Sequence, residues 1–306
     1  MGSEKLDASS VAMSAAIDAT RTSPNSGAKP APNAIQRFFS LNNRFLAPIL
    51  ITCILLSGQL VFGILESWSK TMLAIVTCIA MEMVLSRVVA GKWPHLASAY
   101  ISGISIGILV RSPFLWPYVL CAALSIMSKY VLRWRGKHLW NPSNFGVSMM
   151  FFLYPAAVAS LMIQWGNTLW PMVVVWCLGS LIIWRLKRFH ICLTYVATFL
   201  ALSFVRSQIT GKPWSASVAP LTGPMYQLFV FFMITDPKTT VNSRWGQCVV
   251  AALVAVMEMI LRLAEVVDAP YYALFIVGPI ANVIELATTG HGKPKDNRST
   301  STVVAA

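Results

Sequence analysis

Ten apolar runs, each close to the length that crosses a lipid bilayer, dominate this sequence of 306 residues. A bilayer core of roughly 30 Å needs about 20 helical residues. Hydrophobic residues make up 56% of the chain and charged residues only 11%, which excludes a soluble domain of this length. We therefore predict an all-α integral membrane protein with about ten transmembrane helices. They are expected near residues 45–65, 71–90, 95–110, 114–133, 143–163, 168–185, 189–206, 217–236, 246–264 and 270–287.

Polar segments flank the predicted membrane domain, which spans residues 41–288. Residues 1–40 and 289–306 are poor in apolar residues, and we expect them to be disordered tails. Basic residues are retained on the cytoplasmic side of a membrane. With the N-terminus inside, nineteen of the 24 lysines and arginines fall in cytoplasmic tails and loops. This bias favours an even number of spans and predicts that both termini are cytoplasmic.

The formal charge of +13 does not indicate nucleic-acid binding, because the basic residues punctuate apolar segments and form no basic face on a soluble domain. The six cysteines occur singly, without a CxxC pair, so no metal site is predicted.

A weak internal repeat relates the two halves of the chain. Ala122–Leu124 recurs as Ala251–Leu253, and Val131–Arg133 recurs at the same offset as Ile260–Arg262. The repeat matches the fourth predicted span with the ninth. Two units of five spans follow, and an odd number of spans inverts the second unit in the membrane. Inverted repeats of this kind usually build a site at their interface, near the midplane.

Four acidic residues lie within predicted spans: Glu82, Asp236, Glu258 and Glu285. Each charge costs roughly 2.5–3.5 kcal/mol on insertion scales and therefore needs a partner or a task. The i,i+4 spacing favours an ion pair between Glu258 and Arg262. Glu82 needs a partner on another helix, such as Lys129, or a water-filled cavity. For Glu82 and Glu285 the alternatives are a structural ion pair and an ion path.

The first of two polar interruptions is Asn141–Gly146, with the sequence NPSNFG. Asn141 can cap a helix that begins at Pro142. The backbone N–H groups at such a helix end attract anions. The alternative is a well-capped fifth span without a ligand.

The second interruption is Thr235–Thr240, with the sequence TDPKTT. Pro237 disfavours helix at Asp236 and so ends the eighth span. A carboxylate at a helix C-terminus faces the negative end of the helix dipole and needs compensation. Either Lys238 or Arg244 supplies it, or the environment of a bound cation or redox cofactor does.

In their order and separation, these interruptions resemble the membrane subunits RnfD and NqrB of bacterial electron-transport complexes. The resemblance extends from about residue 125 to 285 and is carried by Ser128–Tyr130, Lys137–His138, Asn141–Gly146, Phe231–Thr240, Ile260–Arg262, Tyr271–Phe275 and Ala281–Asn282. It implies ten spans in two inverted halves and electron transfer through flavin, linked to ion movement. The family attaches FMN to a threonine in an S-G-A-T pattern after the fifth span, whereas this chain has Gln164–Thr168 there. We therefore expect FMN or another flavin to be held noncovalently, as in a shorter RnfD-like group typified by UnbU.

The leading hypothesis is a bacterial inner-membrane redox subunit that uses a flavin or quinone and works with other subunits. The predicted cofactor-binding residues are Asn141, Asn144, Gly146, Thr235, Asp236, Thr239 and Thr240. One alternative is a transporter or channel-like protein of the same fold, with Glu82, Glu285 and Asp236 as an ion path. Another is an assembly or anchoring component for a neighbouring enzyme.

Overall fold

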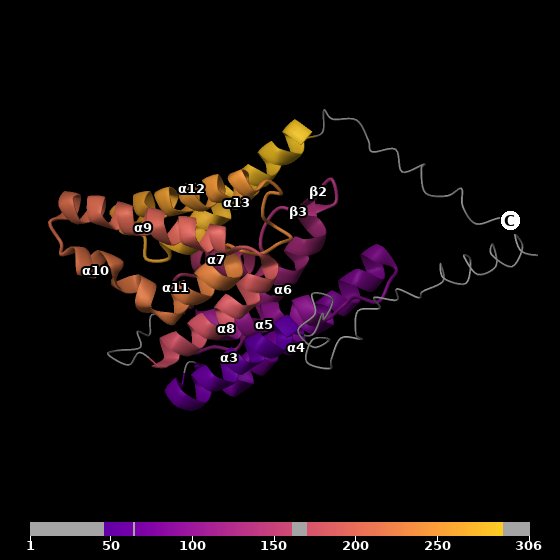
Figure 1. Ribbon diagram of the computed structural model, residues 1–306. Helices are drawn as coiled ribbons and strands as arrows, with labels where there is room; N and C mark the ends of the chain where they lie inside the picture. The colour runs from indigo at the N-terminus through magenta and orange to yellow at the C-terminus, as the bar shows by residue number, and fades with distance from the viewer. Residues whose placement is uncertain (1–45, 64, 161–169, 290–306) are drawn as a thin grey trace, which may run out of the picture. The chain divides into compact units, whose positions relative to one another are not determined.

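The computed structural model describes residues 46–63, 65–160 and 170–289 (Figure 1), all within the compact unit formed by residues 44–306. Of the predicted tails only Thr289 falls within these ranges, and the loop segment Gln164–Thr168 lies outside them.

The first half of the chain forms five helices joined by short loops. They are α3 (Leu46–Phe62), α4 (Trp68–Leu85, continued by a π-helical turn over Ser86–Ala90), α5 (Ala97–Leu109), α6 (Trp116–Val131) and α7 (Pro142–Leu153). Two-stranded ribbons accompany them. The strands β1 (Val110–Arg111) and β4 (Ala159–Ser160) are antiparallel, as are β2 (Arg133–Trp134) and β3 (Lys137–His138).

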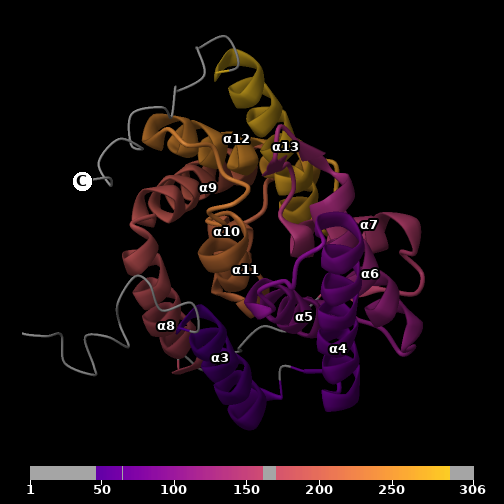
Figure 2. The ribbon, with the colours of Figure 1, turned by 90° about the vertical axis from the view of Figure 1, so that its right-hand side faces the viewer.

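The second half repeats this order with one broken helix. Its elements are α8 (Trp170–Leu186), α9 (Phe189–Thr210), α10 (Trp214–Val218, continued by a 3-10 turn over Ala219–Thr222), α11 (Pro224–Leu228, continued by a π-helical turn over Phe229–Met233), α12 (Arg244–Leu263) and α13 (Ala269–Thr289). Figure 2 shows α10 and α11 surrounded by the other helices.

By length and composition, four continuous helices can cross a membrane, and a fifth crossing is added if the bent pair at 214–222 and 224–233 is one span. The four are the helices at 68–90, 189–210, 244–263 and 269–288. The chain is therefore a multi-pass membrane protein. Helices α3, α5 and α8 are apolar but shorter, so the count of ten spans stays a prediction.

Two of the predicted spans differ from continuous helices, and proline explains both differences. The fifth was expected over 143–163, but α7 ends at Leu153 because Pro155 forces Tyr154 out of the helical region, to φ −134° and ψ 54°. The eighth was expected as one helix over 217–236. It bends by 63° between Thr222 and Pro224, where Gly223 is extended.

The helices of the two halves pack in matching pairs. In the first half α4 packs against α5 and α6, and α6 packs against α7. In the second half α9 packs against α10 and α12, and α12 packs against α13. Contacts of α3 with α8 and of α7 with α13 join the halves. An inverted repeat predicts this pattern, which supports the repeat while leaving it a prediction.

Aromatic side chains form the centre of the core, while large apolar side chains cover its outside. Tyr118, Tyr195, Tyr271 and Phe229 are fully buried. By contrast, Leu60 and Trp245 are each 80% exposed, and many other apolar side chains on the outer helix faces are also exposed. Apolar exposure on this scale needs a covering phase, which lipid supplies.

Helices α4 and α5 approach closely at Gly103. A Cβ atom there would lie 2.5 Å from the Cα atom of Ile75, a backbone atom that cannot rotate away. Small residues at such crossings let the backbones of membrane helices meet.

We therefore expect Gly103→Ala to lower the free energy of unfolding by about 1–3 kcal/mol through overpacking. Gly278→Ala is the matched control, because its Cβ would have only an ordinary 3.6 Å contact with Leu274. Thermal denaturation in detergent measures both variants. Equal stability of the two would contradict the close approach of α4 and α5.

Candidate functional site

The first polar interruption forms a capped helix start. Asn141 is the N-cap of α7, with Pro142 at its first position, and its Oδ1 accepts the Asn144 backbone N–H at 3.1 Å. This confirms the cap predicted from the sequence. The Asn144 side chain is buried and donates from Nδ2 to the Tyr271 carbonyl at 3.2 Å.

A tight hairpin holds the chain just before this cap. Arg133 pairs with His138 and Trp134 with Lys137, and the two residues between the strands both have positive φ, 48° at Arg135 and 80° at Gly136. Positive φ at both central positions is typical of two-residue hairpin turns and favours glycine. The hairpin places His138 a short distance from Asn141.

The second polar interruption wraps around the carboxylate of Asp236. Its Oδ1 accepts the Lys238 backbone N–H at 3.1 Å, and its Oδ2 accepts the Thr239 hydroxyl at 3.0 Å. Its Oδ2 also accepts Asn141 Nδ2 at 3.2 Å, so the two interruptions meet directly. The expected ion pair with Lys238 or Arg244 does not form among the described residues. Neutral donors satisfy the carboxylate instead.

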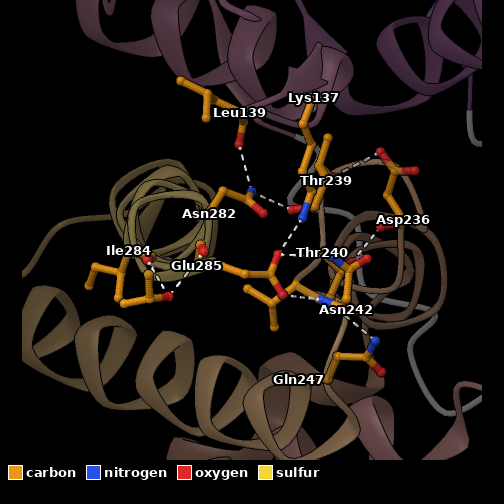
Figure 3. Close-up of polar contacts among 12 residues, drawn as sticks. Lys137, Leu139, Asp236, Thr239, Thr240, Asn242, Gln247, Asn282, Ile284 and Glu285 are labelled. Atoms are coloured by element: carbon orange, nitrogen blue, oxygen red, sulfur yellow. Dashed lines mark hydrogen bonds and ion pairs between the residues drawn. The ribbon is translucent and has the colours of Figure 1, made fainter. Parts of the chain in front are cut away.

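Two side chains of α13 tie the same loops together, as Figure 3 shows. Asn282 donates from Nδ2 to the carbonyls of Leu139 at 3.1 Å and Thr239 at 2.6 Å. Glu285 accepts Lys137 Nζ at 2.8 Å and the Asn242 backbone N–H at 2.5 Å. The hairpin, the cap and the Asp236 loop are therefore held as one unit by α13.

A cavity of about 540 Å³ opens beside the junction of Asn141 and Asp236. Its wall is mostly apolar, with polar groups from α5, α6 and the two interruptions. Residues used below line it: Ser98, Ile101, Ser105, Lys129, His138, Asn141, Phe231, Phe232, Thr235, Asp236 and Thr239. Ligand pockets commonly have this size and this mixture of apolar wall and few polar groups.

The predicted site residues divide into those that line the cavity and those that support it. Four line it: Asn141, Thr235, Asp236 and Thr239. Asn144 and Thr240 lie behind the wall, and the Thr240 hydroxyl donates to the Asp236 carbonyl. Gly146 packs α7 onto α6, since a Cβ there would lie 2.6 Å from the Cys121 carbonyl.

Lys129 lies in the cavity wall and pairs with the carboxylate of Glu82. The distance from Lys129 Nζ to Glu82 Oε2 is 2.8 Å, and the Tyr130 hydroxyl donates to Glu82 Oε1 at 2.9 Å. Both charged side chains are nearly buried. The predicted interhelical partner of Glu82 is thereby confirmed. Glu285 also has a lysine partner, so both acids have the structural pair that was one of their two alternatives.

His138 is a neutral group in the cavity wall at physiological pH. Its pKa is lowered from 6.5 to about 4, chiefly by burial and then by the positive charges of Arg133, Lys238 and Lys129. Its Nδ1 is buried without a hydrogen-bond partner among the described residues. A neutral imidazole in this position can donate to or accept from a ligand.

Sequence reasoning missed much of the cavity wall. Ser98, Ile101 and Ser105 come from α5, which carried no polar interruption or charge to mark it. Their spacing along one helix face was the available signal, but an apolar span with serines has the same pattern when it only packs against neighbours.

A flavin or quinone ring fits this cavity by the chemistry of its lining. The aromatic rings of Phe231 and Phe232 provide an apolar wall, and Asn141 and Thr239 provide hydrogen-bonding groups at one end. The unpartnered Nδ1 of His138 is a further polar atom of the cavity wall.

The geometry describes a multi-pass helical membrane protein with an amphipathic cavity where two broken segments meet. The sequence model of the NQR2, RnfD, RnfE family matches residues 159–291, and over this segment the chain belongs to that family. The matched residues include the Asp236 loop, whereas Asn141 precedes them.

A curated relative is similar to part of the same chain. It is the RnfD-type member of an ion-translocating oxidoreductase complex from Citrobacter koseri, 25% identical over 114 residues. The match covers 37% of this chain and 31% of the relative, so the chain matches about a third of that protein's length.

The buried pair of Glu82 and Lys129 predicts a large but recoverable loss of stability. Either Glu82→Gln or Lys129→Met alone leaves one buried charge unpaired, which costs about 3–5 kcal/mol. The double variant removes both charges, and we expect it to recover most of that loss. Denaturation of the four proteins in detergent measures the cycle. Additive losses would contradict a direct pair.

His138 predicts a dependence of stability on pH. Because its pKa is lower in the folded protein, the unfolded chain binds more protons between about pH 6.5 and pH 4. The contribution of His138 to the free energy of unfolding is therefore complete above pH 6.5 and falls as the pH drops to 4. We expect His138→Gln to reduce this slope in thermal denaturation. An unchanged slope would contradict burial of a neutral imidazole.

Proposed function

We propose that this protein is a membrane subunit of an Rnf-type or Nqr-type ion-translocating oxidoreductase, and that its cavity binds a flavin or quinone noncovalently. The observation that carries the proposal is the hydrogen bond between Asn141 and Asp236 at the edge of a cavity of about 540 Å³. The family match and the name of the curated relative support the same class of protein.

Each part of the cavity wall would act on such a ring in a distinct way. The rings of Phe231 and Phe232 would stack on its faces or edges and exclude water. The Asn141 amide and the Thr239 hydroxyl lie beside Asp236 and would orient its polar edge. A bound flavin or quinone would supply the capacity to accept and release electrons, which the protein side chains lack.

Lys129 would place a positive charge beside the bound ring. Its partner Glu82 balances that charge when the cavity holds no anion. A ring that gains electrons becomes more negative and is stabilised by a nearby cation in a low-dielectric site. The pair of Lys129 and Glu82 therefore makes the cavity responsive to the charge of its ligand.

Ion movement, partners and location complete the proposal. Glu82 and Glu285 are the proposed ion-path residues, and a passing cation would have to displace the lysine that now pairs with each carboxylate. Other membrane or peripheral subunits would deliver and remove electrons. The proposed location is the bacterial inner membrane, with both termini in the cytoplasm.

The rival proposal keeps the fold without a redox cofactor. A transporter or channel-like protein would use Glu82, Glu285 and Asp236 for ions, and an assembly component would use the cavity for neither purpose. The mixed lining of the cavity, with aromatic rings opposite a few polar groups, favours the redox proposal.

The first test is the absorbance and fluorescence spectrum of the protein purified in detergent, before and after acid denaturation, with its intact mass. We expect flavin released by acid and an unmodified chain mass. An adduct mass would contradict noncovalent binding. A colourless protein that also fails to bind added riboflavin, FMN or a soluble quinone would favour the transporter or assembly proposals.

A cavity-filling variant locates the ligand. Ser105→Phe adds a ring to the cavity wall, and Leu193→Phe, on the exposed face of α9, is the matched control. We expect the first variant to weaken binding at least tenfold, about 1.4 kcal/mol, with no change in the control. Equal binding by both would place the ligand elsewhere. Fluorescence quenching of added riboflavin measures the affinity.

A further inference from the structure

Glu258 is a buried acid for which no ion-pair partner occurs among the described residues. Its exposed fraction is 0%, and it lies on α12 against α9. Three other glutamates, Glu66, Glu82 and Glu285, each pair with a lysine at 2.8 Å or less. The predicted i,i+4 pair with Arg262 is wrong. Arg262 donates to the Ser217 carbonyl at 2.9 Å instead and lies over the ring of Phe199.

Two tyrosine hydroxyls from two other helices hold the Glu258 carboxyl. The Tyr226 hydroxyl of α11 donates to Oε1 at 2.6 Å, and the Tyr195 hydroxyl of α9 donates to Oε2. A hydroxyl both donates and accepts hydrogen bonds. If Glu258 gains a proton, one tyrosine can rotate and accept from it, so the cluster keeps its hydrogen bonds in either protonation state.

The surroundings of the cluster contain few other charges. Arg262 on α12 and Arg206 on α9 lie toward the ends of their helices and are half-buried. The hydroxyl of Tyr271, on α13, interacts electrostatically with Tyr226 and has no hydrogen-bond partner among the described residues. An isolated carboxylate in such a place costs far more than a neutral carboxyl, unless it is paired.

A small pocket connects this cluster to the molecular surface. Its volume is about 10 Å³, close to the minimum for one water molecule. Ala255, Met259 and Arg262 on α12 line it, as do Ser203 and Arg206 on α9. Glu258 follows Arg244, the first residue of α12, by fourteen positions, which places it roughly 21 Å along the helix from the Asp236 end. The pocket is therefore separate from the cavity described above.

We propose that Glu258, with Tyr195 and Tyr226, is a proton-exchange site that water reaches through the pocket at Arg206 and Arg262. Its ligand is a proton. Uptake forms an O–H bond on a carboxylate oxygen, and release returns the proton to a water molecule in the pocket, so no electrons move. This site requires no redox cofactor and stands independently of the function proposed for the cavity.

Infrared spectroscopy tests the proposal on the full-length protein in a detergent that lacks ester carbonyls. We expect a protonated-carboxyl C=O band that is lost in Glu258→Gln and retained in Glu265→Gln, a nearby exposed glutamate. The band should shift in D2O and weaken as the pH rises. Absence of a difference between wild type and Glu258→Gln at every pH would overturn the proposal.

Two further results are decisive. A band assigned to Glu258 that neither shifts in D2O nor responds to pH would show a static proton and would overturn exchange. If Glu258→Gln does not fold, Tyr226→Phe keeps the carboxyl and removes one hydrogen bond. The band should then persist at a shifted frequency, and an unshifted band would overturn the arrangement with Tyr226.

Discussion

The hydrogen bond from Asn141 to Asp236 is the contact on which the rest of the candidate site depends. It joins two places where the chain leaves helical structure, one in each half of the sequence. Non-helical backbone within a membrane protein is tolerated where other groups satisfy it or where it lines a cavity. Both conditions hold here. Asn282 and Glu285 bind the loops from α13, and the cavity opens beside the junction.

Charge burial divides the acidic residues of this protein into two kinds. Glu82 and Glu285 have lysine partners, so their charges are balanced within the protein. Asp236 and Glu258 are satisfied by neutral donors. Asp236 lies at the cavity, where a ligand can approach it, whereas Glu258 is fully buried between α9 and α12 with only a small pocket nearby. Neutral hydrogen bonds leave a carboxyl group free to change its charge without breaking an ion pair.

Proline decides where the helical pattern fails and so where function can be placed. Pro142 begins α7, Pro155 follows its end, and Pro224 begins the second part of the bent pair. The bend of 63° redirects the chain toward the Asp236 loop. A continuous apolar helix would have carried that loop elsewhere, and the polar groups of the two interruptions would not have met.

The sequence by itself determined the helical membrane class, the positions of most helices, the cap at Asn141 and the need of Glu82 for Lys129. These follow from local chemistry: apolar length, capping preference and the cost of a buried charge act within one segment or name a small set of partners. Only the tertiary structure decided the contact of Asn141 with Asp236, the contribution of α5 to the cavity and the tyrosine partners of Glu258. Each of these depends on which helix faces which, and apolar helices in lipid have many equally apolar faces, so close packing and hydrogen bonds between distant segments make that choice.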